Sequence, residues 1–249
     1  MLTRLRPCVD VETLLCPLCG GGGTHYGEKD GATLRWCHSG HAAVLISFPW
    51  ETAEQYERQY LDTEYHRGAC ERLGLPWQES RFDEHRLACH SRLTWILEHC
   101  APESLLDVGA SNAAMVYSAK EFELPASGVE PSSHMCQWVR ENLGIVLANV
   151  GWRELWGSWG IITACDVIEH LLDPVAFLRK CLEHTRLLYL ETPDWSSAHG
   201  PEWKHVKPKE HPILYSRDAL IELVNHAGWR VKEEDVPIIG KRVVLLTPR

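Results

Sequence analysis

The residues best suited to hold a polar ligand lie where two apolar stretches end. Asp107 closes the first stretch and is followed by a loop of small residues that includes Gly109, Ser111 and Asn112. Glu130 closes the second stretch. A glycine lets the backbone approach a ligand closely because it has no Cβ. A carboxylate at the tip of the second strand of a doubly wound sheet can accept hydrogen bonds from both hydroxyls of a ribose. The pattern therefore predicts a nucleoside site.

The charge beside this loop narrows the choice of ligand. A dinucleotide site has the pattern G-x-G-x-x-G, which seats a pyrophosphate at a helix N-terminus. Here Gly109 is followed by Ser111 and Ala113 in place of the later glycines, and Asp107 adds a negative charge next to the loop. An anion at this place disfavours a phosphate ligand and favours a cationic one.

A second polar cluster follows another apolar stretch. The stretch 161–165 is followed by Asp166, Glu169 and His170. Pro174 then stands where a new helix would begin. Because ligands of open α/β sheets bind at the carboxyl ends of the strands, we expect this cluster to lie at the same edge as the first loop.

These two motifs resemble those of class I S-adenosylmethionine-dependent methyltransferases. The loop at Gly109 resembles their motif I. The stretch D-V-I-E-H-L-L-D-P at 166–174 resembles the signature of a subgroup that includes ubiquinone-biosynthesis O-methyltransferases and many natural-product and sugar methyltransferases. The resemblance covers 104–249, with both motifs in the family's order and spacing.

The resemblance implies a fold and a cofactor. The fold is α/β, a doubly wound, seven-stranded methyltransferase sheet with helices on both faces. The cofactor is S-adenosylmethionine, whose sulfonium and ammonium groups suit the acidic loop. The residues that would bind it are Asp107, Gly109, Ser111, Asn112, Glu130 and Asp166.

The remaining elements follow from apolar spacing. The stretch 187–193 is expected to form the fifth strand, and 229–236 with 242–247 the closing antiparallel pair. Ahead of the sheet, 53–73 and 82–99 have the spacing of two helices.

A group of cysteines near the N-terminus has the spacing of a metal site. Cys16 and Cys19 form C-x2-C, and Cys37 with His41 forms C-x3-H. Two residues between cysteines point both thiolates at one ion. Four protein ligands leave no open position, so the pattern predicts a structural zinc. The fourth ligand is assigned to His41, and His38 and Cys8 remain alternatives.

The zinc cluster and the sheet motifs divide the chain into three parts. Residues 1–48 are expected to form a small zinc-ribbon-like module, 49–103 a helical linker or cap, and 104–249 the cofactor-binding domain. The module resembles the N-terminal zinc module of large-subunit rRNA guanine-N1 methyltransferases, and zinc modules also precede some sugar C-methyltransferases.

Methyl transfer to many acceptors requires a base. Histidine suits this role because it titrates near neutral pH. The candidates are His170, His205 and His211. We expect the acceptor to bind between the 166–170 cluster and the loop after the fifth strand. Trp195 and Trp203 are expected to wall its pocket, and Asp166 and Glu169 could either orient it or bind a divalent ion. Most of the helical segment before the sheet is expected to be packing, and the residues in it that could face a substrate are Tyr56, Tyr60, Tyr65 and His66.

Composition excludes several classes of protein. The chain has 249 residues, of which 45% are hydrophobic, which is enough for a large core. A net charge of −9 disfavours nucleic acid as the partner and is compatible with a small-molecule acceptor. No apolar run is long enough to cross a membrane, and no leader pattern is present. The 10 cysteines are then expected to be reduced thiols in the cytoplasm, apart from any that bind zinc.

Two other functions stay open from the sequence. The zinc module is also compatible with an RNA-base (guanine) methyltransferase. The incomplete glycine pattern at Ser111 and Ala113 is also compatible with a non-catalytic binding or scaffold protein of the same fold. The identity of the acceptor, the methylated atom and the oligomeric state are undetermined at this level.

Overall fold

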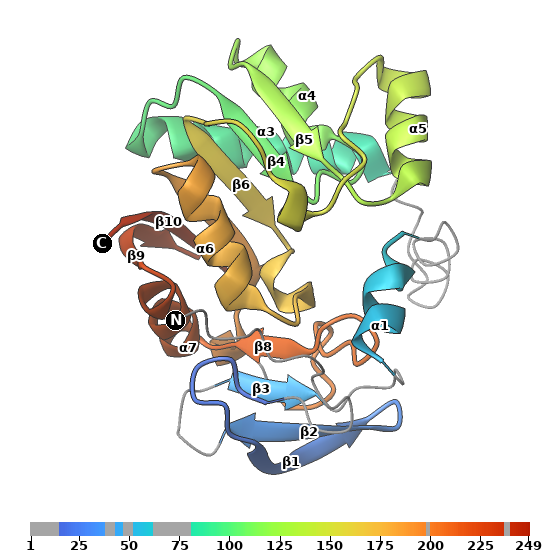
Figure 1. Cartoon of the computed structure of the whole chain (residues 1–249), viewed down its shortest axis with the longest axis vertical. Helices are drawn as coiled ribbons and strands as arrows, with labels where there is room; N and C mark the ends of the chain where they lie inside the picture. The colour runs from blue at the N-terminus through green and yellow to red at the C-terminus, as the bar shows by residue number, and fades with distance from the viewer. Residues whose placement is uncertain (1–14, 38–42, 47–51, 62–80, 198–199, 237–239) are drawn as a thin grey trace, which may run out of the picture.

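A mostly parallel six-stranded sheet forms the larger part of the structure (Figure 1). The structure is a computed structural model that describes residues 15–37, 43–46, 52–61, 81–197, 200–236 and 240–249. The strand order is β5-β4-β6-β7-β10-β9, in which β10 runs antiparallel to both of its neighbours. The strands are β4 (Leu105–Val108), β5 (Ala126–Val129), β6 (Ile161–Cys165), β7 (Leu188–Pro193), β9 (Trp229–Asp235) and β10 (Lys241–Pro248).

Helices cover both faces of this sheet, as the sequence predicts. Leu105 and Ile161 pack against α3 and α4, whereas the next residues along each strand, Leu106 and Ile162, pack against α6 and α7. Side chains alternate between the faces because a strand has a period of two. Burial on both faces explains why most residues of the parallel strands are apolar. The helices are α3 (Phe82–His99), α4 (Ala114–Glu121), α5 (Ser133–Leu143), α6 (Pro174–His184) and α7 (Arg217–His226).

The expected seventh strand is reduced to a single bridge among the described residues. Ala148 pairs in parallel with Val129, and its N–H donates to the Gly128 carbonyl. The chain then turns, because the Val150 N–H donates back to the Ala148 carbonyl over 2.9 Å. The Asn149 side chain bonds the carbonyls of Glu130 and Pro131 in place of a further strand residue. The expectation of seven strands is corrected to six for this reason.

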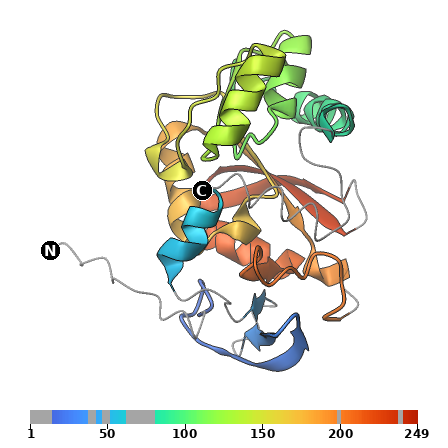
Figure 2. The same ribbon diagram turned by 90° about the vertical axis from the view of Figure 1, so that its right-hand side faces the viewer.

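A second, antiparallel sheet contains strands from both ends of the chain (Figures 1 and 2). Its order is β1-β2-β3-β8, and β8 follows the His211 loop, far from the other three strands in sequence. In the pairing of β3 with β8, Leu45 lies opposite Ile213. The expected N-terminal module is thus joined by strand pairing to the later part of the chain. The strands are β1 (Gly23–Lys29), β2 (Ala32–Cys37), β3 (Ala43–Ile46) and β8 (Ile213–Tyr215).

The two predicted N-terminal helices have different outcomes. The helix predicted over 82–99 is confirmed as α3. In the other, α1 (Ala53–Gln59), the Thr52 side chain accepts from the Gln55 N–H over 3.1 Å and caps the first turn. α1 ends at Gln59, well before residue 73, and is followed by a turn at Tyr60 and Leu61. Residues 62–73 of that prediction lie outside the described part of the chain.

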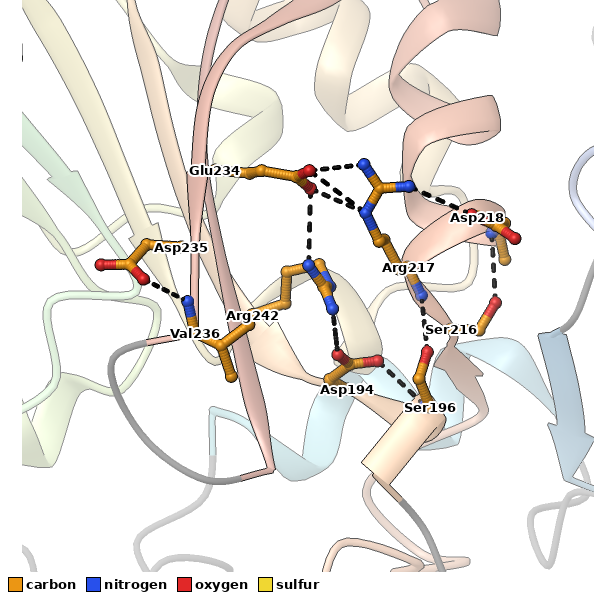
Figure 3. Close-up of polar contacts among 10 residues, drawn as sticks. Asp194, Ser196, Ser216, Arg217, Asp218, Glu234, Asp235, Val236 and Arg242 are labelled. Carbon is orange, nitrogen blue, oxygen red and sulfur yellow. Dashed lines mark hydrogen bonds and ion pairs between the residues drawn. The ribbon is translucent and has the colours of Figure 1, made fainter.

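A chain of charged side chains ties the end of β7 to α7 and to the β9–β10 pair (Figure 3). Two nitrogens of Arg242 donate to Asp194 Oδ2, over 2.6 and 3.1 Å, and both side chains are buried. Glu234 accepts from Arg242 and from Arg217. The Arg217 N–H donates to Ser196 Oγ over 3.1 Å. These bonds hold the start of the loop that leads to His205 and His211.

None of the helices in the described ranges has the length and apolar character needed to cross a membrane.

Removing Arg242 should strongly destabilise the fold. Arg242→Ala leaves the Asp194 carboxylate buried without its cation, which costs about 3–5 kcal/mol of unfolding free energy. The matched control is Arg58→Ala, since the Arg58–Glu54 pair is 71% and 73% exposed and is worth about 0–1 kcal/mol. Urea unfolding measures both. The double variant Asp194→Ala/Arg242→Ala should recover part of the loss. Equal stabilities for Arg242→Ala and Arg58→Ala would show that the buried pair contributes no more than the exposed one.

Candidate functional site

The loop after β4 has the backbone of a glycine-rich loop although it has one glycine. Gly109, Ser111 and Ala113 all have positive φ, at 73°, 46° and 60°. A Cβ at Gly109 would lie 2.9 Å from the side chain of Val167, so this position requires glycine. Ser111 and Ala113 adopt the left-handed conformation in spite of their side chains. The predicted close-approach loop is therefore present, with strain at two residues.

Glu130 lies beside this loop at the end of β5, as the sequence predicts for a ligand-facing carboxylate. Its two oxygens accept from the N–H groups of Ser111 and Ser132, each over 2.8 Å. The side chain is buried. Burial raises the pKa of Glu130 to about 7, in opposition to the two backbone hydrogen bonds. Each oxygen has a further lone pair with which to accept from a ligand hydroxyl.

Asp107 and Asn112 have partners within the protein. Thr163 Oγ1 donates to Asp107 Oδ1 over 2.7 Å and links β4 to β6. Burial raises the pKa of Asp107 to about 7. Asn112 Oδ1 accepts from the Ala114 N–H, and its Nδ2 lies 3.0 Å from Nδ1 of His85 on α3. The sequence did not single out His85, which contacts the loop only because of how α3 packs.

Asp166 is held by a network of ion pairs at the ends of β6 and β7. Lys241 Nζ donates to Asp166 over 2.5 Å and to Glu191 over 3.0 Å. Arg92 makes two hydrogen bonds to the same Glu191 carboxylate, of 2.7 and 2.5 Å. Burial by itself would raise the pKa of Asp166, but the Lys241 ammonium holds it below its usual value. Sequence reasoning missed Arg92 and Lys241. Two features of the sequence could have identified them. Arg92 lies among apolar residues of the helix predicted over 82–99, and Lys241 stands next to the last predicted strand.

His170 and His211, two of the three candidate bases, are brought together. Their ring centroids lie 4.5 Å apart. His170 Nδ1 lies 2.9 Å from the Glu210 carbonyl, and His211 Nδ1 lies 2.7 Å from the His205 carbonyl. Because a carbonyl only accepts, each Nδ1 carries the proton and each Nε2 has a lone pair. Burial lowers the pKa of His170 to about 4 and that of His211 well below its usual value, so both rings are neutral at pH 7.

The third candidate base, His205, lies on the same loop and packs against a tryptophan. Its ring packs on Trp203, with centroids 4.7 Å apart. Its Nε2 is buried and makes no hydrogen bond to the described residues. Burial lowers the pKa of His205 to about 4. Through its carbonyl, His205 orients the ring of His211.

Glu169 completes this group of side chains. It belongs to the short 3-10 helix Ile168–His170, directly after β6. Its Oε2 accepts from Thr192 Oγ1 over 2.9 Å, whereas its Oε1 is buried and has no hydrogen-bond partner among the described residues. Burial and the nearby Asp166 raise the pKa of Glu169 to about 8.

Two tyrosines of the N-terminal part support the histidines. The Tyr56 hydroxyl lies 2.7 Å from both the His170 and the Glu210 carbonyls. The Tyr60 hydroxyl donates to the Tyr56 hydroxyl over 2.8 Å and lies 3.0 Å from His170 Nδ1. The other two residues expected here, Tyr65 and His66, lie outside the described part of the chain.

The two tryptophans of the loop after β7 have a packing role that differs from the expected one. Trp195 is buried in a cluster with Leu34 and Ile46 of the second sheet, and Trp203 packs against the same cluster. Tyr26 of β1 contacts the edge of Trp195, with ring centroids 5.5 Å apart. The rings expected to wall an acceptor pocket instead fasten the second sheet to the loop.

The N-terminal cysteines converge as predicted for metal ligands. The sulfurs of Cys16, Cys19 and Cys37 all lie within 4.8 Å of one another, and those of Cys19 and Cys37 are 3.6 Å apart. Zn–S bonds of about 2.3 Å in a tetrahedron put sulfurs about 3.8 Å apart, so this donor set fits zinc. The turn is closed by Cys16 N–H donating to Gly21, with Gly20 at φ 65°. His41, His38 and Cys8, the candidates for the fourth ligand, lie outside the described residues.

Comparisons with known proteins agree with this geometry. A family model described as a methyltransferase domain matches residues 78–234. Magnesium protoporphyrin IX methyltransferase from Synechocystis PCC 6803, solved with bound SAH, is similar with a TM-score of 0.58 and 12% identity, covering 79% of this chain and 100% of that one. The CcbJ methyltransferase from Streptomyces caelestis has a TM-score of 0.54 and 13% identity, covering 66% and 89%. The mitomycin 7-O-methyltransferase MmcR has a TM-score of 0.58 and 12% identity, covering 78% and 60%.

No curated protein sequence matches the chain. At the identities above, the likeness to solved structures establishes the fold, and the family model establishes the family. Since that model spans well over half of the 249 residues, this protein belongs to the methyltransferase-domain family and is a methyltransferase.

Proposed function

We propose that this methyltransferase binds S-adenosylmethionine and transfers its methyl group to a small-molecule acceptor. The observation that carries the proposal is the arrangement of side chains along one edge of the large sheet. The loop at Gly109 and Glu130 lie at the ends of β4 and β5, and His170 lies just beyond β6. The carboxyl ends of parallel strands are where doubly wound folds bind ligands.

The cofactor end of this edge suits a nucleoside with a positive charge. Glu130 would accept from the ribose hydroxyls while the Ser111 and Ser132 N–H groups hold its orientation. Gly109 lets the cofactor approach the backbone, and Asp107 adds negative charge that favours a sulfonium. Ser111, Asn112 and Asp166 would complete the binding site, with Asp166 positioned by Lys241.

The acceptor end supplies bases that are neutral at pH 7. The acceptor atom would lose its proton to a histidine Nε2 and then attack the methyl carbon. The C–S bond breaks as this bond forms, and its electron pair returns to sulfur, which leaves as a neutral thioether. His211 is our first candidate for the base and His170 the second. His205 acts by orienting His211.

The small-molecule acceptor is supported by charge and by two of the similar proteins. With a net charge of −9, the chain has no general attraction for a nucleic acid backbone. The similar proteins include methyltransferases named for magnesium protoporphyrin IX and for mitomycin. No contact among the described residues favours the RNA-base alternative.

We further propose that Cys16, Cys19, Cys37 and His41 bind one structural zinc. With four protein ligands the ion would have no open position. Its place is at the start of β1 and the end of β2, so it would hold the second sheet together where the apolar core is small.

The transfer itself is tested with cofactor labelled in its methyl group. The full chain is incubated with the small-molecule ultrafiltrate, the RNA and the protein of a cell extract, each separately. We expect label to enter the small-molecule fraction.

His211→Ala should lower the rate of methyl transfer about 10²–10⁴-fold and leave the Kd for the cofactor nearly unchanged, because His211 is proposed to contact the acceptor. His226→Ala, on the helix α7, is the matched control. Label in RNA alone would support the RNA alternative, and none in any fraction the scaffold alternative.

Glu130 should determine cofactor affinity. Glu130→Ala should weaken S-adenosylmethionine binding at least about tenfold, near 1.4 kcal/mol, because the ribose hydroxyls lose their acceptor. Isothermal titration calorimetry measures the Kd, and Glu141→Ala, on the exposed face of α5, is the control. If parent and variant bind equally tightly, the ribose is held elsewhere.

Thiolate-bound zinc should be released by modification of cysteine. Treating the purified chain with a mercurial thiol reagent should free about one zinc per chain, which a colorimetric chelator measures. Cys19→Ser should lose this equivalent, whereas Cys100→Ser should keep it, since Cys100 caps the C-terminus of α3 and its thiol donates to the Ile96 carbonyl. A well-folded chain that releases no zinc would contradict the assignment.

A further inference from the structure

Glu169 has an oxygen that nothing in the methyl-transfer scheme uses. The side chain is 1% exposed, and Thr192 satisfies only its Oε2. Oε1 is buried without a hydrogen-bond partner among the described residues. A buried carboxyl oxygen left unpaired costs free energy, and a ligand at Oε1 would offset that cost.

Two histidines offer ring nitrogens close to the Glu169 carboxyl group. One ring nitrogen of His170, one of His211 and one oxygen of Glu169 all lie within 4.8 Å of one another. Each Nδ1 is engaged by a backbone carbonyl, of Glu210 or of His205. Metal-binding histidines usually donate their second ring N–H in this way, which fixes the tautomer and leaves Nε2 to the ion.

The donor set selects a class of ion. Bonds of about 2.0–2.2 Å put neighbouring nitrogen and oxygen ligands about 3–3.5 Å apart, so small side-chain rotations would close the cluster on one ion. Two imidazoles and one carboxylate suit divalent zinc, iron or cobalt, and three protein ligands leave positions open for a substrate. This differs from the thiolate cluster of Cys16, Cys19 and Cys37, which has soft donors.

The charges around the cluster act in both directions. Glu210 and Asp166 favour a positive charge at His170, whereas Lys207 disfavours one at both histidines. Lys241 is paired with Asp166 and Glu191, and Lys207 lies 3.2 Å from Glu210 Oε2. Asp166 lies on the same short segment as Glu169 but does not belong to the cluster of Glu169, His170 and His211. Its carboxylate is instead paired with Lys241.

We propose that Glu169, His170 and His211 bind one divalent transition-metal ion whose open positions take a hydroxyl or carbonyl oxygen of the acceptor. The role toward the acceptor rests on the proposed function. The ion would lower the pKa of an acceptor hydroxyl, which loses its proton to water, and that oxygen would attack the methyl carbon as the C–S electrons return to sulfur. His211 would then act as a ligand in place of a base.

The test uses the full chain with zinc on its thiolates, freed of weakly bound metal and titrated with Co²⁺ in a calorimeter. We expect one Co²⁺ per chain. Glu169→Gln should weaken binding at least about 100-fold, because a neutral amide oxygen is a much weaker ligand than a carboxylate. His184→Gln is the matched control. Its Nδ1 also bonds a carbonyl and its Nε2 is buried without a hydrogen bond, but it belongs to neither three-ligand cluster of the described residues.

A second readout needs no variant. In the proton spectrum of the Co²⁺-loaded parent, the Nδ1–H protons of His170 and His211 should give two strongly shifted, solvent-exchangeable signals. No Co²⁺ binding up to millimolar concentrations, or equal binding by the parent and Glu169→Gln, would overturn the proposal.

Cofactor binding and labelled-methyl transfer, measured on the same samples, separate the two hypotheses. Methyl transfer that proceeds without Co²⁺ binding would overturn the metal site and leave the proposed function standing. Co²⁺ binding at Glu169 in a chain that binds no S-adenosylmethionine would support the metal site and contradict the proposed function.

Discussion

The pairing of β3 with β8 is the interaction on which the position of His211 depends. β8 is only three residues long, Ile213–Tyr215, and its neighbours in sequence are the His211 loop and the Ser216 cap of α7. A strand this short has little stability alone, so its position comes from the sheet that it completes. The second sheet therefore includes a strand from the later part of the chain, and whatever orders β1 to β3 also helps to place His211. Trp195 and Trp203 reinforce this connection by packing against the same sheet.

In the loop after β4, a hydrogen bond offsets a conformational cost that glycine residues would not have. Holding Ser111 and Ala113 in the left-handed region costs about 1–2 kcal/mol for each residue. The Ser111 N–H donates to Glu130, and a hydrogen bond to a charged group contributes about 1.5–3 kcal/mol. The carboxylate expected to bind a ribose thus also stabilises the loop beside it. Loop shape and carboxylate position are consequently coupled, and a change at Glu130 would reach the backbone at Ser111.

Local pattern was enough to predict most elements but not the contacts between them. The strands at Leu105, Ile161 and Leu188 and the helix α3 follow from apolar runs and helical spacing. The expected seventh strand does not form, because the Asn149 side chain donates to the carbonyls of Glu130 and Pro131. Strand propensity, which is a property of single residues, does not predict such side-chain contacts.

Pairings between distant parts of the chain were out of reach for the same reason. The Arg92–Glu191 pair spans 99 positions, and β3 meets β8 only in the folded chain. Candidate site residues could be predicted where a motif marks them, as at Glu130 and His211. Arg92 and Lys241, whose positions depend on packing alone, could not.

The balance of charge along the sheet edge explains why a cationic cofactor suits it. Arg92 and Lys241 are matched by Glu191 and Asp166, so these four groups sum to about zero. Asp107 and Glu130 have no ion-pair partner in the described ranges, and burial raises the pKa of each to about 7. A carboxyl group whose folded pKa lies above its unfolded value destabilises the fold when ionised, and this cost declines as the pH falls from about 7 to the unfolded pKa near about 4. A sulfonium nearby favours the ionised form and offsets the same cost at neutral pH. A phosphate would add a third negative charge to the two carboxylates and make both harder to ionise.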